Sequence, residues 1–141
     1  MLDALAGLAL LGLLAVGVLS MLHLSVHMMQ QAARLDRARE AAQSIVARCD
    51  AVSWARLPEF FHATPDRSRA WLDTTDGTAP IAWQRLIDTL PGGRIRACLE
   101  GLGPQGRPAD FGRALALRLR VELLFDGGPR ERRLELSSVR F

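Results

Sequence analysis

The pattern of apolar and polar positions divides the chain into three parts, and the first is a long apolar run. A single acid, Asp3, stands near its start, and from Ala4 to Leu22 the only polar side chain is that of Ser20. A helix of this length crosses a hydrocarbon core of about 30 Å, whereas the apolar core of a secretory signal has only about 7–15 residues. The run therefore predicts a retained membrane-spanning helix in residues 1–29, with a buried core helix as the alternative.

The second part, residues 30–57, has the pattern of an amphipathic helix. Its apolar side chains recur at steps of three or four residues, which places them on one helix face. They are Ala32, Leu35, Ala38, Ala42, Ile45, Cys49 and Val52, and the opposite face carries Arg34, Arg37, Glu40, Gln43 and Arg48. Because no proline or glycine falls between Val18 and Leu57, and Pro58 cannot continue a helix, the sequence predicts one helix through residue 57.

The third part, residues 58–141, has the pattern of a small α+β domain. Residues 58–80 are rich in turn formers, with a short helix expected at 66–72, and 81–90 fit a short amphipathic helix. Residues 94–100 fit a strand. In ALALRLRVELLF the apolar side chains alternate with polar ones, and Asp126-Gly127-Gly128 predicts a hairpin turn. On the returning strand Leu134 and Leu136 are expected to face inward. The predicted fold class is α+β, with the long helix packed on a small antiparallel sheet.

The charged residues suggest one candidate binding surface on the hairpin and argue against nucleic acid as a partner. The 18 basic residues, all arginine, and 15 acids give a net charge of +3. No block of like charges suggests a nucleic-acid-binding arm. We place four arginines on the solvent face of the hairpin as candidate phosphate contacts: Arg118, Arg120, Arg132 and Arg133. Because Glu122, Glu131 and Glu135 lie between them, we do not expect nucleic acid to be the partner.

The cysteines and histidines leave alternatives open, and no catalytic motif is present. Cys49 and Cys98 could form a disulfide between helix and sheet, but the alternation that turns Ile95 and Leu99 inward points Cys98 outward, so free thiols remain the alternative. His23 and His27 are spaced as helix neighbours without a third ligand, which is more typical of a membrane interface than of a metal site. No nucleophile elbow, phosphate loop or zinc motif occurs. We expect no enzyme activity, no cofactor and no metal.

Three stretches of the sequence, in this order, resemble type IV pilin-like proteins. They are the acid followed by LAGLALLGLLAVGVL, the segment IAWQRLIDTLPGG, and the closing hairpin LRLRVELLFDGGPRERRLELSSVRF. The resemblance is to the minor pilins of type IV pili and the pseudopilins of type II secretion. It implies a structural subunit whose helix enters a filament, at the tip or in an initiation complex. The alternative is a single-pass anchored periplasmic domain that binds a partner and never enters a filament.

The resemblance also implies a maturation route and assembly residues. Mature pilins carry Glu at position five behind a basic leader, whereas position five here is Leu5 and the acid is Asp3. Either a leader and two mature residues precede Met1, or the processing site differs from that of the family. In the first case Asp3 takes the place of the family glutamate, which pairs with the N-terminal amine of a neighbouring subunit. The implied partners are other pilin or pseudopilin subunits, the inner membrane and a prepilin peptidase.

The charges that flank the apolar run bear on its orientation. Arginines Arg34, Arg37 and Arg39 follow the run and none precedes it, so the positive-inside rule alone would place the C-terminal domain in the cytoplasm. A basic leader that is later removed would reverse this count. We therefore expect a single pass through the bacterial inner membrane with a periplasmic C-terminal domain, which becomes extracellular in a filament.

Overall fold

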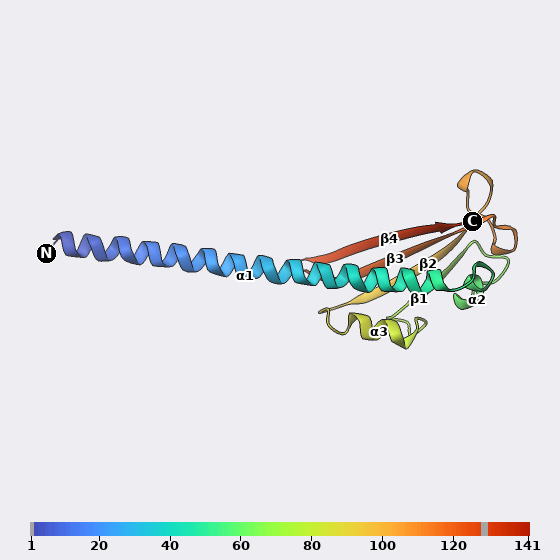
Figure 1. The fold of residues 1–141 in the computed structure, drawn as a ribbon, viewed down its shortest axis with the longest axis horizontal. Helices are drawn as coiled ribbons and strands as arrows, with labels where there is room; N and C mark the ends of the chain where they lie inside the picture. The colour runs from blue at the N-terminus through green and yellow to red at the C-terminus, as the bar shows by residue number, and fades with distance from the viewer. Residues whose placement is uncertain (1, 128–129) are drawn as a thin grey trace. The chain divides into compact units, whose positions relative to one another are not determined.

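Helix α1 dominates the first part of the chain and extends from Leu2 to Ala51. The computed structural model describes the backbone of residues 2–127 and 130–141 and the side chains from Gly7 onward. Two compact units divide the chain, one ending at Leu35 and the other covering Asp36–Phe141. Helix α1 therefore contributes residues to both units (Figure 1).

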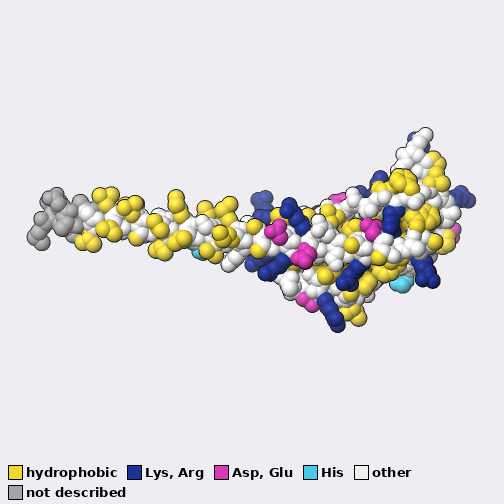
Figure 2. Space-filling model, viewed as in Figure 1, with side chains coloured by type: hydrophobic (Ala, Val, Ile, Leu, Met, Phe, Trp, Pro, Cys, Tyr) yellow, Lys and Arg dark blue, Asp and Glu magenta, His cyan; other side chains and the backbone are white. Residues whose placement is uncertain are grey.

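The described part of the first unit is an apolar helix. All side chains from Gly7 to Gln30 are exposed, and Figure 2 shows apolar side chains around this stretch of helix. Helix α1 contains a segment that is long and apolar enough to cross a membrane, with none of that segment buried. This confirms the predicted apolar helix and excludes, for the described residues, a helix buried inside the chain's own core.

The second unit begins with the amphipathic half of α1, which packs against the sheet. Five of its side chains are buried: Ala38, Ala41, Ala42, Ile45 and Cys49. Four of these belong to the predicted stripe. The small alanine side chains allow the helix backbone to lie close to the sheet, and Ile45 is the largest of the five buried side chains. The packing of helix on sheet confirms the α+β arrangement.

The predicted end of this helix was wrong, because α1 ends at Ala51 and not at residue 57. The guanidinium of Arg140 donates hydrogen bonds to the carbonyl oxygens of Asp50 and Val52, the latter at 2.9 Å. These are carbonyls that the helix itself leaves unpaired at its C-terminus. A 3₁₀ turn at Trp54–Arg56 follows, and Pro58 then occupies the second position of a separate short helix, α2 (Leu57–Phe60).

The sheet has four antiparallel strands in the order β1-β2-β3-β4. They are β1 (Arg69–Asp73), β2 (Arg94–Leu102), β3 (Ala116–Asp126) and β4 (Glu131–Arg140). Residues paired across the strands share a face, so the register defines an inner face that is buried. Its largest members are Leu72, Ile95, Leu99, Leu117, Leu119, Val121, Leu123 and Phe125. As predicted, Leu134 and Leu136 lie on this face, where they are half-buried.

The connections show one wrong prediction and one that holds. The helix expected at 66–72 is absent, because most of that segment forms edge strand β1. The helix predicted at 81–90 is present as α3 (Ile81–Ile87), which buries Trp83 and Ile87. Two further 3₁₀ turns, Pro104–Gly106 and Phe111–Arg113, lie between β2 and β3. The hairpin loop joins Asp126 to Glu131, but Gly128 of the predicted turn lies outside the described residues.

Candidate functional site: an exposed apolar helix and the polar face of the sheet

The exposed apolar helix is the first candidate site, because water is a poor environment for it. Its leucine, valine and methionine side chains from Leu8 to Met29 are each more than half exposed, and Leu13 is 74 % exposed. Full burial of one such side chain contributes about 1.5–3 kcal/mol. Soluble proteins rarely leave a continuous apolar surface of this size uncovered. The segment therefore requires a membrane or other protein around it.

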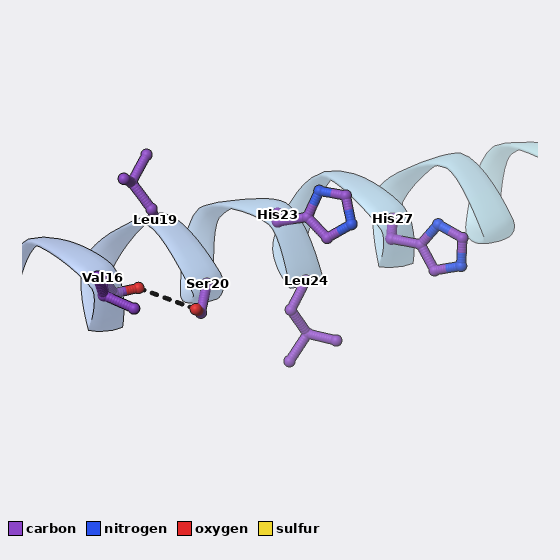
Figure 3. A pocket seen from close by; sticks show the side chains of 6 residues that line it. All are labelled: Val16, Leu19, Ser20, His23, Leu24 and His27. Carbon is purple, nitrogen blue, oxygen red and sulfur yellow. Dashed lines mark hydrogen bonds between the residues drawn. The ribbon is translucent and has the colours of Figure 1, made fainter.

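The polar side chains within this helix form hydrogen bonds locally. The hydroxyl of Ser20 donates to the carbonyl oxygen of Val16 at 2.8 Å, and that of Ser25 donates to Met21 at 2.9 Å. Figure 3 shows Ser20 on one helix face with Val16, Leu19, His23, Leu24 and His27. Because these hydroxyls already have partners, an apolar environment does not leave them unsatisfied. All six residues come from one helix, so this surface is an open face and not an enclosed cavity.

The two histidines on that face lie parallel to each other. The ring centroids of His23 and His27 are 6.5 Å apart and the rings are inclined by 8°. Among the residues that the structure describes, no group of three or more potential metal ligands occurs. The arrangement gives no support to a metal centre at this helix face.

The predicted assembly residues lie at the edge of what the structure describes. Met1 is outside the described residues. The backbone of Asp3 is part of α1, but the structure does not describe the Asp3 side chain. The predicted pairing of Asp3 with an N-terminal amine therefore stays a prediction.

The outer face of the sheet is the second candidate site, and ion pairs cover it. Glu100 lies between two arginines, with Nη2 of Arg69 at 2.7 Å and Nη1 of Arg118 at 3.3 Å. On the neighbouring strands Arg133 pairs with Glu122 at 2.5 Å and with Glu135 at 3.2 Å. Arg120 reaches Glu135 at 3.0 Å. Opposite charges alternate from Arg69 through Glu100 to Arg118, which stabilises the neighbouring strands. Glu122 and Glu135 lie directly opposite each other, and Arg133 pairs with both of them.

This geometry argues against the four arginines as one phosphate-binding patch. Arg118, Arg120 and Arg133 lie on the outer face, but each is already paired with a glutamate. The placement of Arg132 beside them was wrong. In the strand register Arg132 is opposite Phe125, which faces inward, so Arg132 lies on the inner face of the sheet. A phosphate would have to displace existing partners at each of the three outer arginines.

The two cysteines are free and lie on opposite sides of the sheet, which corrects the disulfide alternative. Cys49 is buried on the side of the sheet that α1 covers. Cys98 points outward as the strand alternation predicted, with Trp71 and Arg120 as its cross-strand neighbours. Burial, with a smaller contribution from the charge of Glu100, raises the pKa of Cys98 to about 11. The thiol is therefore protonated at neutral pH and is a poor nucleophile.

Asp73 is a buried acid on the outer face that the sequence did not single out. Its carboxylate accepts hydrogen bonds from the backbone N–H of Thr75 at 2.8 Å and from Nε of Arg96 at 3.0 Å. Burial alone would raise the pKa of Asp73, but these hydrogen bonds outweigh it, so the pKa lies below its ordinary value of 3.8. The sequence does contain Asp73 and its partner Arg96, but the two residues become neighbours only when β1 pairs with β2.

The lowered pKa of Asp73 predicts a loss of stability in acid. Because the folded state holds the ionised form, its contribution is complete well above pH 3.8 and disappears as the pH falls through the folded-state pKa. We expect Asp73→Asn to lower the free energy of unfolding by about 1–2 kcal/mol at pH 7. Urea unfolding of the two proteins between pH 2 and 7 measures this, and the two curves should converge at the acidic end. An equal difference at every pH would contradict the assignment.

No family model matches the chain, and no curated protein or solved structure matches it significantly. The class of this protein is therefore defined only by the structure of the chain. It consists of one helix that could span a membrane and an α+β unit in which the continuation of that helix packs on a four-stranded antiparallel sheet.

Proposed function

We propose that this chain is a structural subunit of a filament of the type IV pilus kind, as a minor pilin or as a type II secretion pseudopilin. One observation carries the proposal. A helix whose described N-terminal side chains are apolar and exposed has a second half that packs on a four-stranded antiparallel sheet. Such a chain has one segment for a membrane or filament core and one folded unit that remains in water.

The physical basis of assembly lies in the apolar helix. In a bilayer the lipid chains already cover these side chains, so transfer into a filament gains little from the hydrophobic effect. Close packing between helices and the pairing of Asp3 with the N-terminal amine of a neighbour would supply the difference. An unpaired carboxylate in a bilayer is costly, and pairing removes that cost. The outer sheet face and the loops of the second unit would contact neighbours or cargo.

The maturation and location follow from the same proposal. A prepilin peptidase removes a basic leader, and the subunit then waits in the inner membrane with its second unit in the periplasm. Assembly transfers it to a filament, at the tip or in an initiation complex.

A second candidate function is a single-pass anchored periplasmic domain that binds a partner without entering a filament. The observation that favours it is the same apolar helix, since a helix long and apolar enough to cross a membrane does not need other subunits around it. The two candidates differ in processing and in the fate of Asp3. Only the filament subunit requires a peptidase-dependent N-terminus.

The first experiment is the intact mass and N-terminal sequence of the membrane-derived chain, from cells with and without their prepilin peptidase. We expect an N-methylated end at or just before Met1 only when the peptidase is present. A precursor of higher mass should accumulate in its absence. Filament fractions would then contain the processed chain.

The control is a known substrate of the same peptidase, measured in the same two strains. The same unmethylated N-terminus in both strains, with the control substrate processed normally, would contradict the filament proposal. That result would favour the anchored partner-binding domain.

A further inference from the structure

Strand β4 is a long and regular edge of the sheet in the second unit. It pairs with β3 alone, without a bulge along its whole length. The N–H of Gly127 donates to the carbonyl oxygen of Arg130 at the hairpin, so the even-numbered residues of β4 bond to β3 and the odd-numbered ones turn their backbone groups outward. Within the part of the chain that the structure describes, these outward groups have no partner. Natural edge strands are commonly short, bulged or interrupted by proline, and β4 has none of these protections.

The apolar inner face of the sheet also ends uncovered at this edge. Leu134 and Leu136 of β4 are half-buried, whereas their partners on β3, Leu123 and Val121, are completely buried. Another strand beside β4 would bring its side chains within about 4.5–5.5 Å of these leucines. The edge therefore offers both backbone hydrogen bonds and apolar surface to a second chain.

Strand β1, at the opposite edge, offers a short complement. The N–H of Asp73 donates to the hydroxyl of Thr78 and not to β2, so the odd-numbered residues of β1 are the ones whose backbone groups face outward. Asp73 uses these groups within the chain. Those of Arg69 and Trp71 have no partner among the described residues, and both side chains are exposed.

The directions of the two edge strands favour a second copy of this chain as the occupant. Every neighbouring pair of strands is antiparallel and the sheet has four strands, so β1 and β4 run in opposite directions. A second copy in the same orientation therefore presents its β1 antiparallel to β4, and the two sheets become one. Pairing of β4 with another β4 would instead turn one copy around. Because the subunits of one filament share a direction, this choice of β1 over β4 rests on the proposed function.

The side chains favour one register between β4 and the β1 of a second copy. It places the outward backbone groups of odd-numbered residues opposite each other, as an antiparallel ladder requires. Its pairs are Arg69 with Ser137, Ala70 with Leu136, Trp71 with Glu135, Leu72 with Leu134 and Asp73 with Arg133. Both inner-face pairs are apolar, and the acid of Asp73 is beside an arginine. A shift of two residues in either direction places Asp73 beside Glu131 or Glu135, where like charges repel.

We propose that β4 binds strand β1 of a second copy of this chain in this register, so that neighbouring subunits share one continuous sheet. The contact is heterologous, and the β4 of the second copy can accept a third, which is the geometry of an open filament. Because Arg69 and Trp71 supply the outward groups of β1, the contact is small and weak in dilute solution. It forms where a membrane or a filament core already holds the copies close together.

The test is disulfide cross-linking between two variants of the full chain, reconstituted together in liposomes. One carries Arg69→Cys and the other Ser137→Cys, both with Cys98→Ser because Cys98 and Arg69 line the same small pocket on the outer face. The register places these positions about 5.5 Å apart at Cα, within the range that a disulfide spans. We expect mild oxidation to give dimers with one chain of each kind, at a yield at least about tenfold above that of either variant alone.

The matched control for random collision replaces Ser137→Cys with Arg48→Cys, since Arg48 is an exposed residue of the same unit on helix α1. Glu135→Cys and Val139→Cys test the register, and each should cross-link less efficiently to Arg69→Cys than Ser137→Cys does. A yield no higher than that of the Arg48→Cys control would overturn the proposal. Efficient dimerisation of Ser137→Cys alone would also overturn it, because β4 would then pair with itself.

The result is independent of N-terminal processing, because the liposomes contain no peptidase. A specific cross-link between positions 69 and 137, in a chain whose N-terminus proves to be unprocessed in cells, would support the edge contact while contradicting the filament proposal.

Discussion

Replacing Leu10 and Leu14 with arginine is expected to remove most of the chain from the membrane fraction. Both leucines are exposed in the described part of the apolar helix and lie one helical turn apart. An arginine near the centre of a membrane-spanning helix costs about 3 kcal/mol on insertion scales. Two such changes lower the insertion equilibrium constant by a factor of about 10⁴. Extraction of membranes at alkaline pH, followed by immunodetection of pellet and supernatant, measures the effect.

The matched control is Ala47→Arg/Ala51→Arg, the same pair of changes at the same spacing on the exposed side of the second unit. It should leave the chain in the membrane pellet. If the Leu10→Arg/Leu14→Arg chain resists alkaline extraction as well as the control does, the helix does not span the membrane. Both candidate functions would then lose their common basis.

The two halves of α1 could be predicted because each has a local signal. The apolar run needs only its length and composition, and the stripe of Ala38, Ala42, Ile45 and Cys49 needs only the period of a helix. The end of the helix could not be predicted in this way. It depends on Arg140, which is 90 residues beyond Asp50 in the chain and caps its carbonyl from the last residue of β4. No local pattern around Ala51 contains that information.

Strand β1 was missed for a related reason. The segment RAWLD is only five residues long, and its strand conformation comes from pairing with β2, as in Trp71 opposite Cys98. The longer strands β2 and β3 carried their own alternation and were predicted correctly. A short edge strand is defined by its neighbour more than by its own residues.

The candidate sites show the same division. The exposed apolar helix follows from the sequence alone. The pairing of the outer sheet face does not, because it requires the register that brings Glu100 between Arg69 and Arg118. The error at Arg132 had a simpler cause, since adjacent strand residues such as Arg132 and Arg133 face opposite sides.

The second large effect is expected for Trp83→Ala, which removes the largest buried side chain of the second unit. Trp83 is 2 % exposed in helix α3, and its ring lies 6.4 Å from that of Phe60. Replacing a buried tryptophan with alanine costs about 3–5 kcal/mol, through lost burial and the cavity that remains. This is a large share of the about 5–15 kcal/mol by which folded domains are stable. Urea unfolding of the full chain in detergent, followed by circular dichroism, measures the change.

Trp54→Ala is the matched control, because Trp54 is 39 % exposed and carries the same side chain. It should cost about 1 kcal/mol or less, as exposed side chains usually do. Equal losses in the two variants would show that Trp83 does not hold α3 in place.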